Sequence, residues 1–312
     1  MKAGNKIYEA INQKTIKLLQ EQLSGYKQTW FNVKAEMFGY NPHTQHHYSA
    51  LNNFLLQISL IFCRPGYYLN RWMTFLQVQE IGAKIKKGSF ADMIVFTSHI
   101  WIDQNGSNVT KKVDTMLNAG QQIPDGFKKI PFLKGYYVFN VADIEGLPEE
   151  YTKPKNVNLT ASDRIKAVDE IINRTGAVID ETNTNRAYYI QERDIIRIPK
   201  RWQFDTTEDF YKTLFHELGH WTGHTNRLKR DMSQEREKYA FEELVAELTA
   251  AYCCAKLNIC AEVTNNAAYL QAWLKALDSD MKFFTHAAAQ AQKAADYILT
   301  GNAEEAEERR AA

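Results

Sequence analysis

Apolar residues recur at helical spacing in two early segments of the chain. One apolar stripe, at positions i, i+3, i+4, i+7 and i+11, is formed by Leu51, Phe54, Leu55, Ile58 and Phe62. An earlier stripe of the same kind is formed by Ile7, Ile11, Leu18 and Leu19. Two short runs rich in β-branched and aromatic residues, 93–102 and 136–141, predict strands, and glycine and proline between them predict a long loop over 105–126. The first half of the chain is therefore predicted to be an α+β domain.

The second half of the chain has a different order of elements. Glycine, proline and charged residues without an apolar period predict a linker over 146–162, which separates a first domain, 1–145, from a second domain, 163–312. The second domain is predicted to contain a helix over 162–174, short strands at 177–180, 187–190 and 194–198, and helices from about residue 207 to a charged tail at 302–312. We therefore expect a small antiparallel sheet followed by a helix bundle, within a two-domain α+β fold.

Composition limits the class of protein. The chain has 312 residues, of which 45% are hydrophobic and 24% are charged, as in a globular protein of about two domains. No run approaches the roughly 18 to 20 apolar residues that a membrane span needs, and the start lacks the apolar centre of a signal peptide. The four cysteines form no CxxC pair. These features predict a soluble, cytoplasmic protein with free thiols and no contact with a membrane.

Charge is divided unequally between the two halves. Residues 1–155 contain 18 Lys and Arg residues against 12 Asp and Glu residues, whereas residues 156–312 contain 20 against 25. The first half thus carries a formal charge of +6 and the second half −5, although the whole chain has +1. A basic half suits a polyanion such as nucleic acid. A protein that mimics DNA would need a strongly acidic surface, so this class is excluded.

The strongest chemical signal is the sequence HELGH at residues 216–220, in a segment for which Thr206 or Thr207 can serve as the helix N-cap. Residues i and i+4 of a helix share a face, so His216 and His220 can bind one Zn²⁺ ion, and Glu217 can act as general base on a water molecule. Another divalent metal such as Mn²⁺ is an alternative. The competing interpretation is a pair of solvent-facing histidines on an amphipathic helix.

A catalytic zinc site needs a third protein ligand. The extended pattern HExxHxxGxxH would require a histidine where the chain has Asn226. His224 is two positions out of register, and Gly223 is expected to end the helix before it. The sequence therefore excludes the three-histidine arrangement.

A glutamate from the following predicted helix, 239–257, can supply the third ligand. Glu243 and Glu247 lie four residues apart on a stripe of small residues, which allows another helix to approach closely. We assign Glu243 as the third ligand and Glu247 as the acceptor of the free N–H of His216 or His220. Glu242 or Glu247 as the ligand is an alternative, and so is an acidic face that is simply solvated.

Two stretches of the second half, YKTLFHELGHWTGHTNRLKR at 211–230 and YAFEELVAELTAAYCC at 239–254, resemble the metallopeptidase-like domain of ArdC-type antirestriction proteins. Three segments of the first half, YSALNNFLL, RWMTFLQVQEIGAKIKKG and YYVFNVADIEGLP, resemble the family's N-terminal single-stranded DNA-binding domain, which some plasmid primases share. The resemblance spans roughly residues 26 to 300. The chain departs from the family at Ala50, where a glycine-rich turn is common, and in an enlarged segment at 106–126.

This resemblance implies a nucleic-acid-binding first domain, a zincin-like second domain, and a role in protecting incoming plasmid or phage DNA from host restriction. It also implies a metal site at His216, His220 and Glu243, with Glu217 catalytic. Host restriction-modification proteins would then be substrates or targets. The closest rival is a non-enzymatic single-stranded DNA shield whose metal is structural, but such a site has no use for Glu217.

Residues for binding single-stranded DNA can be suggested in the first half. Phosphates can be met by Lys84, Lys86 and Lys87. Flat side chains on which bases can stack are offered by Trp30, Tyr48, Arg71 and Trp72. The competing interpretation is that these aromatic residues fill the core and that the lysines belong to an ordinary solvated loop.

Overall fold

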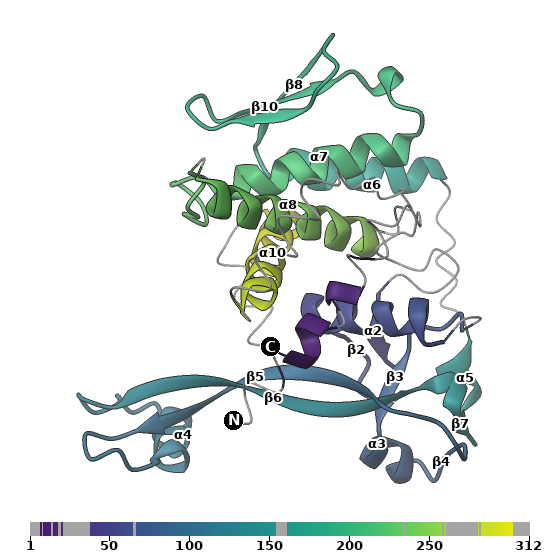
Figure 1. Cartoon of the computed structure of the whole chain (residues 1–312), viewed down its shortest axis with the longest axis vertical. Coiled ribbons are helices and arrows are strands. Elements are labelled where there is room, and N and C mark those ends of the chain that lie inside the picture. The colour runs from purple at the N-terminus through teal and green to yellow at the C-terminus, as the bar shows by residue number, and fades with distance from the viewer. Residues whose placement is uncertain are drawn as a thin grey trace.

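The computed structural model describes residues 38–64, 67–153, 161–233, 235–257 and 282–301, and single positions at 7, 9–13, 15–17, 20, 259 and 280. The elements form two groups (Figure 1): a long two-stranded ribbon with helix α2 on it, and above them a set of helices that carries a small sheet. The predicted charged tail at 302–312 lies outside the described residues. None of the helices in this described part is both long and apolar enough to cross a membrane.

Three antiparallel strands form the main sheet of the first half, in the order β3–β6–β5. They are β3 (Trp72–Thr74), β5 (Asp92–Ile102) and β6 (Lys128–Asn140). The predicted strand at 93–102 is confirmed as β5. Strand β6 begins at Lys128, well before the predicted residue 136, because it pairs with β5 along the whole length of that strand. Lysines and a proline interrupt the alternation of apolar and polar residues in this segment, so the sequence does not show the strand. The pairs with β5 keep the segment extended.

Helix α4 (Thr110–Asn118) lies within the segment that the sequence predicts to be a loop, so that prediction is wrong. The helix is short, and Val113 is its only buried residue. A stripe of one residue gives no detectable period. The start of the helix is tied to β5, because the Thr110 hydroxyl accepts a hydrogen bond from the Trp101 N–H at 2.9 Å.

Helix α2 (Ala50–Phe62) confirms the predicted amphipathic helix and packs on the sheet. Its Asn52 side chain accepts from the Val95 N–H and donates to the Val95 carbonyl, both at 2.8 Å. This pairing satisfies backbone groups at the open edge of β5. The smaller elements of the first half are β1 (Tyr40–Asn41), β2 (His46–His47), α3 (Phe75–Glu80), β4 (Lys84–Ile85), η1 (Val141–Asp143), β7 (Ile144–Glu145) and α5 (Glu149–Thr152).

The second half follows the predicted order of helix, short strands and helices. Its elements are α6 (Ala161–Arg174), β8 (Val178–Thr182), β9 (Tyr188–Ile190), β10 (Ile195–Pro199), η2 (Arg201–Gln203), α7 (Thr207–Thr222), α8 (Arg236–Lys256) and α10 (Phe283–Thr300). The sheet is mixed rather than antiparallel as predicted, because β10 pairs parallel to β8 and antiparallel to β9. Strand β10 is central because it is the most apolar: Ile196 and Ile198 are fully buried and need a neighbour on each side.

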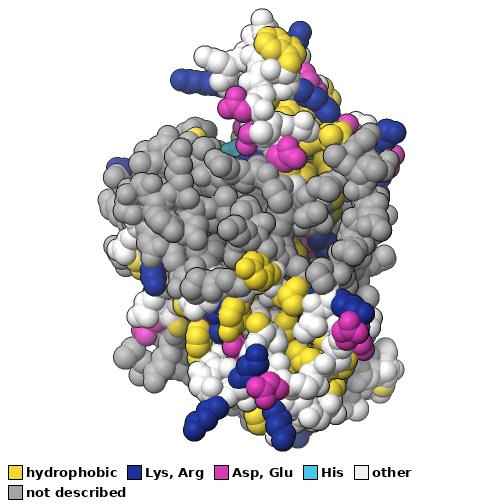
Figure 2. Space-filling model, turned by 90° about the vertical axis from the view of Figure 1, so that its right-hand side faces the viewer, with side chains coloured by type: hydrophobic (Ala, Val, Ile, Leu, Met, Phe, Trp, Pro, Cys, Tyr) yellow, Lys and Arg dark blue, Asp and Glu magenta, His cyan; other side chains and the backbone are white. Residues whose placement is uncertain are grey.

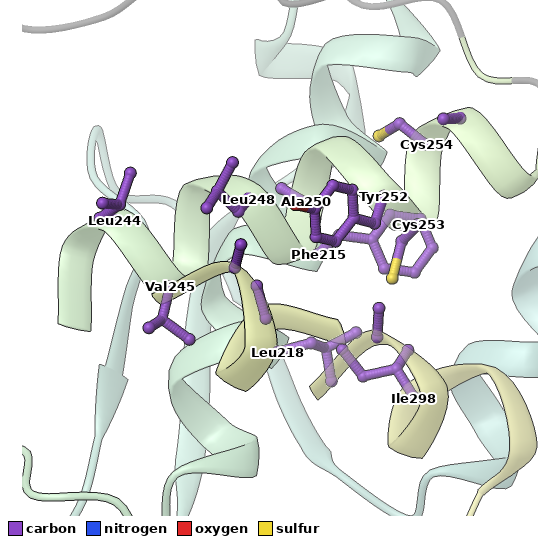
Figure 3. Close-up of a cluster of buried hydrophobic side chains, with 14 of the residues drawn as sticks. Phe215, Leu218, Leu244, Val245, Leu248, Ala250, Tyr252, Cys253, Cys254 and Ile298 are labelled. Atoms are coloured by element: carbon purple, nitrogen blue, oxygen red, sulfur yellow. The ribbon is translucent and has the colours of Figure 1, made fainter. Parts of the chain in front are cut away.

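One hydrophobic core runs through both halves of the described chain. Side chains of α7, α8 and α10 meet in it, among them Phe215, Leu248 and Ile298 (Figure 3). The same core continues into α2, where the Phe54 ring lies 4.6 Å from the Phe284 ring of α10 between centroids. The two groups of elements are therefore packed together.

The predicted domain boundaries remain a prediction. Within the predicted linker, Glu149–Thr152 forms α5 and α6 begins at Ala161. Residues 154–160 lie outside the described residues. In the part of the chain that the structure describes, Cys63, Cys253 and Cys254 form no disulfide bond with one another.

Candidate metal centre

Helix α7 carries the HELGH sequence and has the predicted ends. Thr206 is the N-cap, and its side-chain oxygen accepts a hydrogen bond from the Asp209 N–H at 3.1 Å. The helix ends before Gly223, so His224 lies beyond it. The helix therefore presents two histidines, one turn apart, to whatever packs against it.

Helix α8 packs against α7 at very short range. A methyl group added to Gly219 would lie 3.0 Å from the Cα of Ala246 and 3.3 Å from the Cβ of Thr249. The glycine in one helix and the small residue in the other thus allow the two backbones to approach. This approach brings Glu243, one turn before Ala246, against the histidines of α7.

We expect Gly219→Val to lower the free energy of unfolding by about 1 to 3 kcal/mol, because the added side chain overpacks the contact with Ala246. The midpoint of urea denaturation measures the change. Ala289→Val, at an exposed position of α10, is the control for placing a β-branched residue in a helix. Equal midpoints for the two variants would show that the helices can separate without cost.

Three side chains from α7 and α8 converge on one point. The Nε2 atoms of His216 and His220 lie 3.2 Å apart. The Glu243 carboxylate lies 3.6 Å from Nε2 of His216 and 3.5 Å from Nε2 of His220. A tetrahedral ion with bonds of about 2.0 to 2.1 Å holds its ligand atoms about 3.3 Å apart. The three residues therefore fit a divalent metal ion, and each offers one ligand atom within 4.8 Å of the others.

A second carboxylate stands behind each imidazole. Nδ1 of His216 lies 3.5 Å from Glu247, and Nδ1 of His220 lies 3.3 Å from Glu242. With both Nδ1 atoms facing carboxylates, both Nε2 atoms are turned toward the metal position. Glu242, considered above as an alternative ligand, lies on the Nδ1 side of His220, away from the group that converges on the metal position.

Arg230 belongs to this site, and the sequence reasoning missed it. Its guanidinium contacts both carboxylate oxygens of Glu242, at 2.7 and 2.9 Å, and donates to the Gly219 carbonyl at 2.6 Å. The side chain is 5% exposed and that of Glu242 is 4% exposed. In the sequence Arg230 is one of three basic residues in a short stretch. The conformation of the loop, in which Lys229 has a φ of 53°, determines that Arg230 is the one that reaches Glu242.

We expect Arg230→Met to destabilise the protein by about 3 to 5 kcal/mol, because it removes the guanidinium from the buried Glu242 carboxylate, which then keeps only its contact with His220. Metal affinity should also fall by about 10- to 100-fold, because His220 loses its orientation. Urea denaturation and calorimetric metal titration measure the two effects. The neighbouring exposed Lys229→Met is the control. If both variants behave like the wild type, the ion pair has no role in holding the histidine.

Burial and the neighbouring carboxylates together set the pKa values of the site residues. It lowers the pKa of His216. It also acts to lower the pKa of His220, but the hydrogen bonds to Glu242 and Glu243 outweigh it and the pKa is raised. Burial raises the pKa of Glu217 to about 7, against the attraction of His220. A carboxyl group with this pKa can both accept and donate a proton near neutral pH.

A cavity of about 600 Å³ opens beside these side chains. Its walls are formed by α7, by α8, and by Tyr188 and Tyr189 of β9. Strand β9 is one of the two edge strands of its sheet, and the Glu217 carboxylate accepts a hydrogen bond from the Tyr189 backbone on it. Glu217 and the three convergent ligands thus line a cleft that is bordered by a strand edge.

The predicted DNA-binding side chains differ in whether they are buried or exposed. Trp30 lies outside the described residues. Tyr48, Arg71 and Trp72 are buried, with exposures of 8%, 1% and 0%, so the prediction that they present flat faces to bases is wrong. They hold the fold together, since the Tyr48 hydroxyl donates to the Trp72 carbonyl at 2.9 Å. The lysines at 84, 86 and 87 are exposed, and their role stays a prediction.

The fold and the site define an α+β protein with a zincin-like metallopeptidase domain. Residues 166–290 match the family described as zincin-like metallopeptidase, and residues 5–139 match the N-terminal domain of anti-restriction factor ArdC. The metal-free crystal structure of the antirestriction ArdC protein from the R388 plasmid is similar over 96% of this chain and 98% of that one, at 31% identity and a TM-score of 0.74. This chain belongs to the ArdC family of antirestriction proteins.

Further relatives extend the comparison. The Mn(II)-bound structure of the same R388 protein matches at 30% identity and a TM-score of 0.70, over 94% of this chain and 97% of that one. Two DNA primases TraC of Escherichia coli are 28% and 29% identical over 96% and 94% of this chain. The chain spans only 20% and 27% of their length. The uncharacterized protein y4eC of Sinorhizobium fredii is 28% identical over 94% of this chain and 91% of its own length.

Proposed function

We propose that this protein binds single-stranded DNA in the cytoplasm through its first half and hydrolyses peptide bonds at the metal centre of its second half, as an antirestriction factor of a mobile element. The observation that carries the peptidase part is the position of Glu217. It lines the same cleft as the three convergent ligands, is 6% exposed, and has a pKa of about 7. A site that served only to stabilise the fold would need the histidines but not this carboxyl group.

His216, His220 and Glu243 would hold the ion. Two imidazoles and one carboxylate are a donor set suited to Zn²⁺, with Mn²⁺ as the alternative that the Mn(II)-bound relative supports. When bound, such an ion supplies a Lewis acid that lowers the pKa of a water molecule and polarises a carbonyl group. Glu247 and Glu242 would fix the two imidazoles through their Nδ1 atoms.

Glu217 is the residue that moves the proton. Its carboxylate accepts a proton from the water that attacks the peptide carbonyl, and a carbon–oxygen bond forms. It then delivers this proton to the leaving nitrogen as the carbon–nitrogen bond breaks. The raised pKa suits both steps, because the same group acts as base and then as acid near neutral pH.

The edge of β9 supports a protein substrate. An extended peptide can add to a strand edge through main-chain hydrogen bonds, independently of its sequence. On β9 the backbone of Tyr189 is hydrogen-bonded to the Glu217 carboxylate, so a peptide would pair with the backbone groups beside it. Tyr188 and Tyr189 line the cleft from this strand, opposite Glu217 and Glu243 on the helices. A peptide along β9 would therefore pass through the cleft that contains the metal ligands. Restriction-modification proteins of the host are the proposed substrates.

The first half is proposed to bind DNA. It carries the excess of basic residues, and its family match is the N-terminal domain of anti-restriction factor ArdC. Seen from the side of α5, β4 and β7, this part of the molecule exposes Lys and Arg side chains beside hydrophobic ones (Figure 2). The exposed lysines on and after β4 would meet phosphates, and the Lys86 ammonium would do so while it also donates to the Ala142 carbonyl at 2.9 Å.

Replacing Lys84, Lys86 and Lys87 with alanine should weaken the binding of a single-stranded oligonucleotide. If each lysine meets one phosphate, the slope of log affinity against log salt concentration should become shallower by about 2. Fluorescence anisotropy at several salt concentrations measures the slope. The control replaces three exposed lysines of the second half, Lys166, Lys200 and Lys229. An unchanged slope would remove the β4 lysines from the DNA surface.

The experiment that tests the whole proposal uses the full chain loaded with Zn²⁺ or Mn²⁺. The protein is incubated with subunits of restriction enzymes, with and without single-stranded DNA, and fragments are identified by mass spectrometry. We expect cleavage that a chelator abolishes. Protection of DNA from restriction without any cleavage would favour the second candidate, a DNA shield in which the ion only ties α7 to α8.

A further inference from the structure

The β5–β6 ribbon extends well beyond α2 and carries the short helix α4 near its outer end (Figure 1). Near its inner end the ribbon is covered, since Ile94 and Val138 are buried with residues of α2. Toward its outer end the pairing continues from Phe96 with Lys134 to Ile102 with Lys128. Side chains on this outer part of the ribbon are therefore not covered by α2.

One face of the outer ribbon carries a row of exposed rings. Directly paired residues of two strands share a face, so Tyr136, the Phe96 and Lys134 pair, and Phe132 follow one another along it. Phe96, Phe132 and Tyr136 are 49%, 41% and 38% exposed. Ile130, the next residue of the row, is 41% exposed. Large apolar side chains gathered on a surface mark an interaction site.

The rings of this row are in contact with each other and with a cation. The Phe96 and Tyr136 rings lie 5.4 Å apart between centroids, at an interplanar angle of 88°. The Lys134 ammonium lies 5.0 Å from the centre of the Tyr136 ring. On the opposite face of the ribbon, Met93, Val95 and Leu133 contact the core, whereas Tyr137 is exposed. The row itself starts beyond Ile94 and Val138, which share its face but are buried, and we call this exposed row the outward face.

Beyond Asp92, the first residue of β5, the two paired strands carry only basic charges. From Met93 to Ile102 and from Lys128 to Asn140 the chain has no Asp or Glu, while β6 contains Lys128, Lys129 and Lys134. A second copy of this chain would present the same lysines and repel them, whereas rings interleaved with lysines complement both parts of a nucleotide chain. Bases stack on aromatic faces and phosphates pair with ammonium groups. Charge complementarity thus favours single-stranded nucleic acid over a second protein.

We propose that the outward face of the β5–β6 ribbon, defined by Phe96, Phe132, Lys134 and Tyr136, is a stacking platform for single-stranded DNA. This inference rests on the proposed function, because it names the surface that performs the DNA binding. The buried aromatic residues at 48 and 72 support the inner end of the same sheet and its helix, while the outer rings contact the bases.

The test compares full-length variants in fluorescence anisotropy with a labelled oligothymidylate. Phe132→Leu combined with Tyr136→Leu keeps apolar volume at two partly exposed positions but removes the aromatic faces. We expect a loss of affinity of roughly 5- to 100-fold, as stacking contacts provide. Tyr137→Leu is the matched control, since Tyr137 is 63% exposed on the same strand but points to the opposite face. Circular dichroism checks that all variants fold.

An abasic oligonucleotide of the same length separates stacking from phosphate contact. The wild type should bind it more weakly than oligothymidylate, and the double variant should bind both equally. If the wild type binds oligothymidylate and the double variant binds it as tightly, the platform is refuted and the proposed function stands. If the wild type binds no single-stranded DNA, both fail. If the double variant changes only the oligomeric state in analytical ultracentrifugation, the face is a protein interface and the proposal is overturned.

Discussion

Glu217→Gln will reduce peptide hydrolysis by about 100- to 10,000-fold while leaving metal content, fold and DNA binding unchanged. The amide has nearly the shape of the carboxyl group, so it fills the same buried position. In the proposed mechanism it could not accept a proton from the attacking water, so the general base would be lost. Initial rates of substrate cleavage measure the loss, and elemental analysis verifies that the ion is retained.

The control for this substitution is Glu192→Gln, which changes an exposed carboxylate that lines the same cleft. It should retain activity near that of the wild type. The result in cells then separates the two candidate functions. Full protection of incoming DNA by the Glu217→Gln protein would reject proteolysis as the mechanism and support the DNA shield.

His220→Ala will abolish stoichiometric metal binding. Removing one of three protein ligands leaves an incomplete site. Loss of a residue that only supports a ligand lowers metal affinity by about 10- to 100-fold, and loss of the ligand itself should lower it further. The wild type should retain about one Zn²⁺-class ion through gel filtration and should melt at a higher temperature when metal is added. The variant should show neither effect. Elemental analysis and thermal melts measure both.

His224→Ala is the matched control, because His224 lies near His220 in the sequence but outside the ligand group. It should bind metal like the wild type. Equal metal content in His220→Ala and the wild type would place the ion elsewhere in the protein.

The sequence was sufficient to predict the centre of the site, because its geometry is local. Two histidines four residues apart share a helix face whatever surrounds them, and the Thr206 cap sets where the helix begins. Glu243 could be predicted as the third ligand for a related reason. It stands on a stripe of small residues, and small residues are what a close helix contact such as that of Gly219 with Ala246 requires.

The rest depends on contacts between distant segments. Arg230 reaches Glu242 through a loop whose conformation no periodicity encodes. Helix α4 has a single buried residue, and the central position of β10 follows from competition among three strands for burial. The sequence suggested Trp72 for stacking on bases, but Trp72 is buried. Sequence alone does not show which aromatic rings are buried in the core and which are exposed on the outer ribbon.

The contact between Phe54 of α2 and Phe284 of α10 affects how such a chain can be inherited. Either half alone would expose an apolar surface that the other half covers, so a gene encoding only one half would produce a protein with a large stability defect. The shared core thus makes the two halves depend on each other for stability. The TraC primases agree with this view, since both halves are present together within much longer chains. We therefore expect recombination to move the two halves together, as a single segment.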